Sequence, residues 1–387
     1  MIQDFGFVSN KTFKEKMDTL NSLMVALIET QGGTAKPTSW ANVQALVRAG
    51  LHSKVFSIGD QLVCKKGNDD LVWDIIGIDH DTPTDSQFTH SMTLQLHDCL
   101  PSAMQFDAPE ALYYAENGLA AGTYNFTIQN YDTTYGGGKT YQFTITQAVP
   151  TDGQLTFSWG YNTQAADAKV SSYASSTSTT AIEQVTVIEG SAGTNLGTTD
   201  GNSTNVNHIH RIRYGSNNYG ESAIRQFLNS NAVAGSVWTP QTKYDRPPSW
   251  ASNTEGFMKN LDSDFLAVLG ISHKVTALNN VTDGSSSIVL NDKFFLLSCS
   301  EVYSGMENNI NEGNPYSYYS DYSDLSSAGR GDDSNRIKYR SGAAWWWFLR
   351  SPDSATGGNA RNVNPAGGVN YYIAGGSGGV APACVII

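Results

Sequence analysis

The apolar residues of this chain fall mainly in short runs between turn-forming residues, and this spacing constrains the fold more than any other feature. Such runs, bounded by Gly, Pro, Asn and Asp, are typical of β-strands, whereas helices need longer patterns with a 3.6-residue period. Strands are expected near residues 55–59, 61–64, 72–76, 93–96, 123–128, 140–145, 154–159, 183–188, 275–278, 287–290, 293–297 and 383–387. The pattern predicts a β-rich chain of the α+β class.

Helical patterns are fewer. A heptad-like stripe predicts a helix over residues 10–30, which fits either packing on its own domain or self-association, for example as a trimer. The stripe consists of Phe13, Met17, Leu20, Met24 and Leu27. Further helices are expected at residues 40–48, 221–229 and 264–269. Residues 308–336 are polar and rich in Tyr, Ser, Asp and Gly, which favours a long surface loop.

Residues 117–200 differ in composition from their flanks. They carry period-2 strands separated by turns such as Gly-Gly-Gly at 136–138 and Asp-Gly at 152–153. This pattern predicts a small, immunoglobulin-like β-sandwich inserted into another domain. The expected organisation is an N-terminal helical segment at 1–50, a ligand-binding domain formed by 51–116 with 201–387, and the insert at 117–200.

Charge and cysteine content exclude several classes. The formal net charge is −12 and no basic stripe occurs, so nucleic acid is not an expected partner, because phosphate binding needs clustered Lys and Arg. Neither a signal peptide nor an apolar stretch of membrane-spanning length is found, so no membrane insertion is expected. The cysteines form no CxxC pair, which favours buried thiols of a protein made in a reducing cytoplasm; one or two disulfides are the alternative. They are Cys64, Cys99, Cys299 and Cys384.

Three short motifs have possible chemical roles, and each has a simpler interpretation. His208 and His210 could face one way from a strand as metal ligands, but no third ligand is fixed by spacing. Residues 79–85 contain three aspartates, yet the Gly and terminal Glu of a calcium-binding EF-hand loop are absent. The Arg-Gly-Asp tripeptide at 330–332 is short enough to arise by chance in a polar loop. No catalytic motif, cofactor site or metal site is therefore predicted.

The C-terminal part carries a specific series of motifs. These are WWWFLRSP at 345–352, NARNV at 359–363, GGV at 367–369, Ala374 and GVAPA at 379–383. The series resembles the signature WWLRSP…AR.V…G.V…A….GVRPA of the C-type-lectin-fold variable proteins of diversity-generating retroelements. Segments 71–77, 221–229 and 292–298 resemble further family pieces in the right order, so the resemblance covers residues 51–115 and 205–387. It departs at Ala381, where the family carries Arg, so any fixed salt bridge of that Arg is lost.

The resemblance implies a C-type lectin fold, with the inserted β-sandwich and the N-terminal helical segment, and a binding site of residues altered by mutation of adenines in their codons. Randomised adenines in AAC or AAT codons never yield Lys, Glu, Gln, Met or Trp. Residues 353–387 contain none of these five types, whereas the preceding residues contain 55 of them. This absence supports a variable tail, and a Gly-rich terminal strand region also lowers the count.

A protein that tolerates such variation must separate a scaffold from a display surface, because core packing rejects most substitutions. The expected scaffold residues are Trp345, Trp346, Trp347, Arg350 and Pro352. The expected ligand-binding residues are Asp353, Ser354, Ala355, Thr356, Gly357, Gly358, Asn359, Asn362, Asn364, Asn370, Tyr371, Tyr372, Ile373, Gly375, Gly376, Ser377 and Gly378. Tyr371 and Tyr372 are the expected hot spots, since tyrosine offers a large amphipathic contact at low entropic cost.

The resemblance favours a non-enzymatic binding protein displayed on a phage tail or a cell surface, made in the bacterial cytoplasm without a signal peptide. Its expected partner is a protein or glycan ligand on a bacterial host surface. The alternative is a tail-associated protein that binds or cleaves carbohydrate through a fixed site. A neighbouring reverse transcriptase gene with a template repeat would favour the first interpretation.

Overall fold

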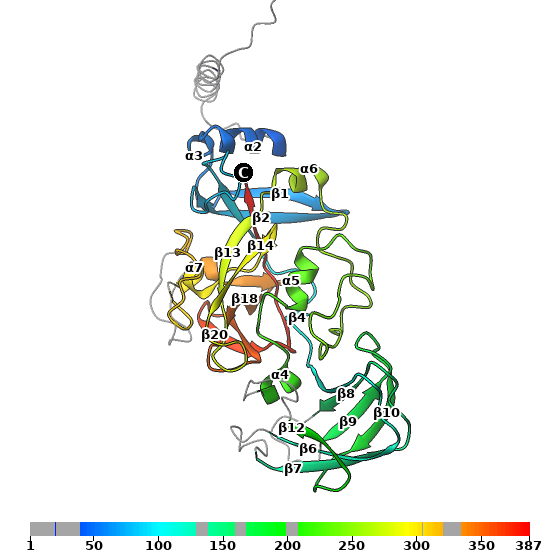
Figure 1. The fold of residues 1–387 in the computed structure, drawn as a ribbon. Coiled ribbons are helices and arrows are strands. Elements are labelled where there is room, and N and C mark those ends of the chain that lie inside the picture. Colours follow the sequence, from blue (N-terminus) through cyan, green and yellow to red (C-terminus); the bar gives the residue numbers. More distant parts are fainter. Residues whose placement is uncertain are drawn as a thin grey trace, which may run out of the picture.

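A five-stranded antiparallel sheet joins segments that lie far apart in the sequence (Figure 1). The computed structural model describes residues 20, 39–128, 138–158, 168–198, 208–303, 305–319 and 334–387, which form mainly β-strands with a few short helices. In sheet order the five strands are β1 (Gln61–Lys66), β2 (Asp69–Ile78), β3 (Met92–Leu96), β22 (Ala383–Ile386) and β15 (Phe294–Phe295). The prediction that residues 72–76 and 293–297 share one core is confirmed.

Both faces of this sheet are covered, because successive side chains of a strand point to opposite sides. On β22, Cys384 and Ile386 enter one hydrophobic cluster, while Ala383 and Val385 enter the other. β22 lies between β3 and β15, so the C-terminal strand is paired along both edges, as its apolar sequence requires. All four cysteines are free and buried, as predicted.

Four helices cover the first face of the sheet. They are α2 (Trp40–Arg48), α3 (His52–Val55), α5 (Ala223–Leu228) and α6 (Ser263–Val268). Three of them confirm the predicted helices, and their N-caps are the polar side chains of Ser39, Ser222 and Asp262. The strand expected at 55–59 is wrong: α3 occupies its start and a turn follows, in which Gly59 has a φ of 90°.

The second face packs on β18 (Trp347–Pro352), α7 (Cys299–Tyr303) and several tyrosines. The prediction of a surface loop over 308–336 is wrong for its described part, because Tyr316, Tyr319 and Arg336 are fully buried. Both tyrosines enter the second hydrophobic cluster, and the Arg336 guanidinium lies 4.6 Å from the ring of Tyr303 on α7. A polar, tyrosine-rich sequence therefore supplies core residues here.

Small sheets and turns form the remainder of the larger domain. They comprise β4 (Met104–Gln105) with β21 (Ser377–Gly378), β13 (Ser272–Ala277) with β14 (Ser287–Asp292), β16 (Lys338–Arg340) with β17 (Ala343–Trp345), β18 with β19 (Asn359–Val363) and β20 (Val369–Ile373), and the 3₁₀ turn Ser334–Arg336. The three-stranded sheet β18–β19–β20 and the segments beside it, at 353–358, 364 and 375–378, carry the expected ligand-binding residues.

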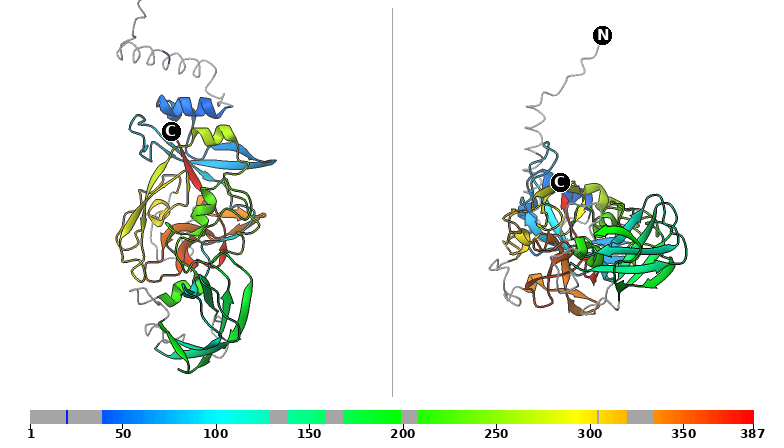
Figure 2. Two further views of the ribbon diagram at one scale, coloured as in Figure 1. Left: turned by 45° about the vertical axis from the view of Figure 1, so that its right-hand side comes forward. Right: turned by 60° about the horizontal axis from the view of Figure 1, so that its bottom comes forward.

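The inserted sandwich is a separate body with its own core (Figure 2). One sheet has the order β10 (Ala181–Thr186), β9 (Lys169–Tyr173), β8 (Gly153–Ser158), β5 (Ala111–Ala115). The other has the order β11 (Ile188–Glu189), β7 (Thr140–Ile145), β6 (Gly122–Thr127), β12 (Thr194–Thr198). The predicted boundary at 116/117 is wrong, since β5 pairs with β8 inside the sandwich. Ile212 of α4 (His208–Tyr214) also enters this core.

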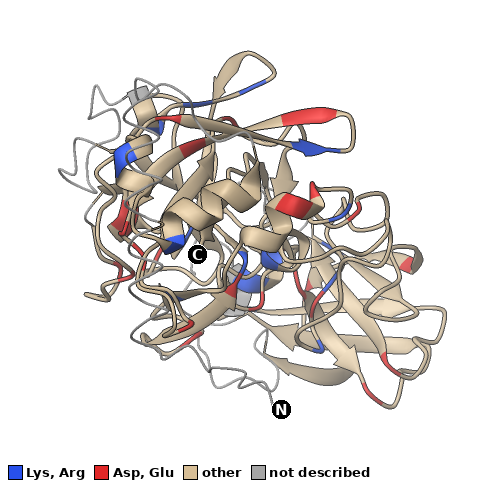
Figure 3. Ribbon diagram, turned by 90° about the horizontal axis from the view of Figure 1, so that it is seen from above, with Lys and Arg blue, Asp and Glu red and all other residues tan. Residues whose placement is uncertain are grey.

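Acidic and basic segments are interspersed in the view from above (Figure 3). In the described part of the chain, no helix is long and apolar enough to cross a membrane. The predicted helix at 10–30, and with it the heptad stripe, lies outside the described residues apart from Leu20.

Candidate ligand-binding surface

The outer strand of the sheet β18–β19–β20 presents two neighbouring tyrosines to solvent. All of β18 is buried, β19 lies between the other two strands, and β20 forms the outer edge of this sheet. Tyr371 is 52% exposed and Tyr372 is 44% exposed, whereas Val369 on the same strand is buried. Within this small sheet, solvent exposure therefore increases from the buried strand β18 to the outer strand β20.

The tyrosines are held by ring contacts rather than left loose. The Tyr372 ring lies 4.7 Å from that of Trp346, which in turn packs 5.0 Å from Phe348 in an edge-on arrangement. The guanidinium of Arg361 lies 5.8 Å from the Tyr371 ring, within reach of a cation–π contact. A Cβ on Gly378 would come within 2.3 Å of the Trp346 ring, so this glycine makes room for the tryptophan. Each exposed tyrosine ring thus has a defined neighbour.

The loop 353–359 beside this strand is fixed by one asparagine from a distant part of the chain. The Asn217 Nδ2 donates to the carbonyls of Thr356 and Asn359, both at 2.8 Å, and to that of Asp353 at 3.3 Å. Its backbone N–H donates to the carbonyl of Gly357 at 3.1 Å. On the loop side these bonds involve only backbone carbonyls, so this attachment does not depend on the identity of the loop side chains.

A buried ion pair adds a second attachment. Arg361 Nε lies 2.7 Å from Glu307, and its Nη2 lies 3.2 Å from Asp353. Glu307 also accepts from the backbone N–H of Ser354 at 3.1 Å. Burial and the acceptor Glu307 act on Arg361 in opposite directions, and the carboxylates prevail, so that the pKa of Arg361 lies above its ordinary value. Scaffold residues thus hold the loop at both its start and its middle.

The structure separates the expected ligand-binding residues into three groups. Those that are exposed are Ala355, Asn370, Tyr371, Tyr372 and Ser377. Those that are half-buried are Ser354, Thr356, Asn359, Asn364, Ile373, Gly375 and Gly376. Those that are buried are Asp353, Gly357, Gly358, Asn362 and Gly378.

The buried group was wrongly assigned to ligand contact, because these residues serve the scaffold. Asp353 is bound by Arg361, and Asn362 sits in the middle of the sheet. Asn364 caps a turn, its Oδ1 accepting from the N–H groups of Ala366 and Gly368 at 2.8 and 3.1 Å. Of the expected scaffold residues, Trp347, Arg350 and Pro352 are buried, while Trp345 and Trp346 are half-buried.

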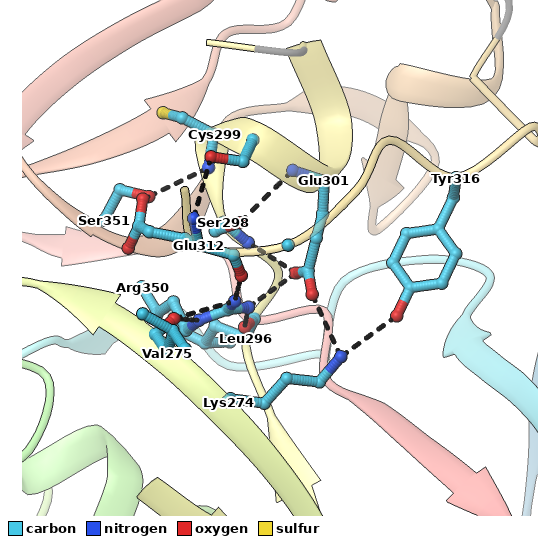
Figure 4. Close-up of polar contacts among 12 residues, drawn as sticks. Lys274, Val275, Leu296, Ser298, Cys299, Glu301, Glu312, Tyr316, Arg350 and Ser351 are labelled. Atoms are coloured by element: carbon cyan, nitrogen blue, oxygen red, sulfur yellow. Dashed lines mark hydrogen bonds and ion pairs between the residues drawn. The ribbon is translucent and has the colours of Figure 1, made fainter. Parts of the chain in front are cut away.

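A chain of buried charges starts at Arg350 on β18, a strand of the same sheet (Figure 4). Arg350 is fully buried; its Nη1 lies 2.5 Å from Glu301 and donates to the Leu296 carbonyl at 2.9 Å. Glu301 also pairs with Lys274 at 2.9 Å, and Lys274 pairs with Asp81 at 2.6 Å. Burial alone would raise the pKa of Glu301, but Arg350 and Lys274 outweigh it and lower that pKa. Each buried charge therefore has a counter-charge.

Glu312 belongs to the same cluster and is also buried, but burial outweighs the nearby cation in its effect on the carboxyl group. It accepts from the N–H of Ala277 at 3.0 Å and from the Ser351 hydroxyl. Burial raises its pKa to about 7, against the opposing effect of Arg350. Its protonation therefore changes near neutral pH.

This shift predicts a pH-dependent stability. Below pH 4.5, the ordinary pKa, Glu312 is protonated in both the folded and the unfolded chain. Between pH 4.5 and about 7, only the folded chain keeps the proton. The free energy of unfolding should therefore fall by about 3 kcal/mol across that window and stay level above it. Glu312→Gln should remove this component, which is measured as the difference between wild-type and variant denaturation curves from pH 4 to 8. A difference that is independent of pH would contradict the assignment.

The structure describes part of the remaining sequence motifs. His208 and His210 lie in helix α4 and not on a strand. Asp79 pairs with His90 at 3.1 Å, and Asp81 pairs with Lys274 at 2.6 Å. No cluster of three or more metal-ligating side chains occurs among the residues that the structure describes. The Arg-Gly-Asp tripeptide lies outside them.

Sequence reasoning missed Asn217, Glu307 and Asn279, whose Nδ2 donates to the Asn217 Oδ1 at 2.8 Å. Asn217 follows Gly215 in a stretch that looks like an ordinary polar turn, so no local signal distinguishes it.

A known family model covers this region of the chain. A family model described as a domain of unknown function, DUF6273, matches residues 184–387, which include the whole candidate surface. No curated protein and no solved structure matches the chain.

Proposed function

This chain belongs to the DUF6273 family, and from the surface built on its C-terminal half we propose that it is a non-enzymatic binding protein. It contacts its ligand through exposed residues on β20 and the adjoining loops, on a backbone held by residues outside that set. The main observation in support of this proposal is that Asn217 fixes the loop 353–359 through backbone carbonyls alone.

The exposed positions support a display role. Ala355, Asn370, Tyr371, Tyr372 and Ser377 are all residue types that altered Asn codons can produce, and all five are exposed. Surface substitutions mostly change stability by less than about 0.5 kcal/mol, so such positions can vary freely. We therefore propose a variable protein of a diversity-generating retroelement with a C-type lectin fold, carried on a phage tail or a cell surface. Its ligand is a protein or glycan on a bacterial host.

The test concerns the two tyrosines. Tyr371→Ala combined with Tyr372→Ala should weaken binding at least about 30-fold, because hot-spot aromatics each contribute about 2 kcal/mol or more. Thermal unfolding should change little, since both side chains are largely exposed. The measurement is binding of the labelled protein to panels of intact bacterial cells and immobilised glycans.

A matched control is Tyr339→Ala. Tyr339 is 46% exposed on β16, outside the candidate surface, so its loss should leave binding unchanged. Equal binding by the double variant and the wild type would rule out the proposed contact surface.

A further inference from the structure

A polar cleft of about 360 Å³ lies beside β13 and shares no residue with the candidate surface. It is lined by the segment 80–84 that follows β2, by residues 272–275 of β13 itself, and by Glu301 and residues 311–314. Pockets that hold small ligands occupy about 300–1,000 Å³, so this cleft is at the small end of that range. Its size suits one small polar molecule.

The charges at the base of the cleft are already balanced. Lys274 pairs with Asp81 and Glu301, and Glu301 pairs in turn with Arg350. Two cations therefore face two carboxylates. Glu312 also lines the cleft, and its raised pKa of about 7 keeps it protonated at lower pH, so below about pH 7 a charged ligand would find no free counter-ion in this set. Around these groups the lining includes hydroxyl, amide and imidazole groups from Thr82, Thr84, His273, Asn311 and Asn314. This chemistry favours a neutral ligand with several hydroxyl groups.

Ser272 lines the cleft, and its side-chain hydroxyl has no partner among the described residues. Ser272 is only 4% exposed. Buried hydroxyl groups nearly always have a partner, so an orphaned one at a cleft points to a partner from outside.

The strand edge beside the cleft is also available. The Val275 carbonyl accepts from Arg350, and the Ala277 N–H donates to Glu312, both on the edge away from β14. Because backbone groups alternate between the two edges of an antiparallel strand, the N–H and C=O of His273 point to this same edge. His273 lines the cleft, so a ligand there meets a backbone donor and acceptor.

We propose that this cleft binds one neutral sugar unit, through Ser272, the backbone of His273 and the surrounding hydroxyl and amide side chains. The site is fixed, and its ligand is independent of whatever the residues on β20 bind.

The experiment is saturation-transfer NMR on the full chain with glucose, galactose, mannose, N-acetylglucosamine and, as a charged probe, glucuronate. At least one neutral sugar should give a signal that glucuronate does not. Ser272→Ala should weaken that binding by about tenfold, the loss of roughly one hydrogen bond. The unfolding midpoint should stay constant or rise, since the variant removes an unsatisfied buried group.

Thr276→Val is the matched control. Thr276 is a buried hydroxyl on the same strand, also without a partner among the described residues, but it does not line the cleft. This variant should bind sugar normally, and so should the Tyr371/Tyr372 double variant. Absence of signal for every neutral sugar, equal loss in the Ser272 and Thr276 variants, or loss in the tyrosine variant would overturn the proposal. Loss of sugar binding in the tyrosine variant would overturn the proposed sugar site, but it would leave the proposed ligand contact through β20 standing.

Discussion

Arg350→Met is expected to destabilise the protein by about 3–5 kcal/mol, since it leaves buried acceptors without their donor. Arg350 is the most extensively bonded buried side chain of the cluster, serving Glu301 and the carbonyls of Leu296, Val275 and Glu312. Lys274 cannot replace it, because it contacts the other oxygen of Glu301. Folded proteins are stable by only about 5–15 kcal/mol, so the variant should be largely unfolded at moderate urea concentrations. Urea denaturation measures the effect.

An exposed ion pair provides the control. Lys65 and Asp70 lie 2.6 Å apart, and both side chains are more than half exposed. Lys65→Met should change the unfolding free energy by no more than about 0.5 kcal/mol, because solvent screens such pairs. If Arg350→Met proved as mild as Lys65→Met, the cluster would not be a determinant of stability.

Trp347→Ala is the second large effect, with an expected loss of about 3–5 kcal/mol from an emptied buried site. Trp347 is fully buried, and its indole N–H donates to the Arg336 carbonyl at 3.0 Å. It joins β18 to the segment that carries Arg336, so its removal opens the second face of the central sheet. Guanidinium denaturation and the loss of near-ultraviolet circular dichroism report the change.

Replacing the neighbouring Trp346 tests whether burial, and not position in the three-tryptophan motif, determines how much stability is lost. Trp346 is half-buried and contacts Tyr372, so Trp346→Ala should cost less than about 2 kcal/mol while disturbing the aromatic surface. The sequence motif alone does not separate the three tryptophans, whereas the structure places Trp347 in the core and leaves Trp346 half-buried. A larger loss for Trp346→Ala than for Trp347→Ala would contradict this account.

The sequence was informative wherever a local pattern decides the structure. Strands β2, β3, β7 and β14 and helices α2, α5 and α6 follow from apolar spacing and capping residues within a few positions. The same reasoning could not place β5, because its short Ala-Leu-Tyr-Tyr-Ala sequence fits either side of the domain boundary. Only its pairing with β8 assigns it to the sandwich.

The candidate site was predictable in outline and not in detail. Alternation of apolar and polar residues correctly indicated exposed tyrosines on a buried base. It could not show that Asp353, Asn362 and Gly378 face inward, because their burial depends on partners far away in the sequence. Asn217 acts on residues more than 130 positions along the chain, and such backbone hydrogen bonds leave no periodic signal.

The central place of β22 has a consequence for the order in which the chain is made. Its residues are synthesised after every position of the candidate surface, yet they form the strand between β3 and β15. Until the ribosome has passed Ile386, β3 and β15 have no common neighbour and both hydrophobic clusters lack a wall. Any product that terminates within the surface region, or continues from it in another reading frame, cannot close this sheet. An incomplete or frame-shifted copy of the segment that carries the candidate surface would therefore lack the strand that joins β3 to β15.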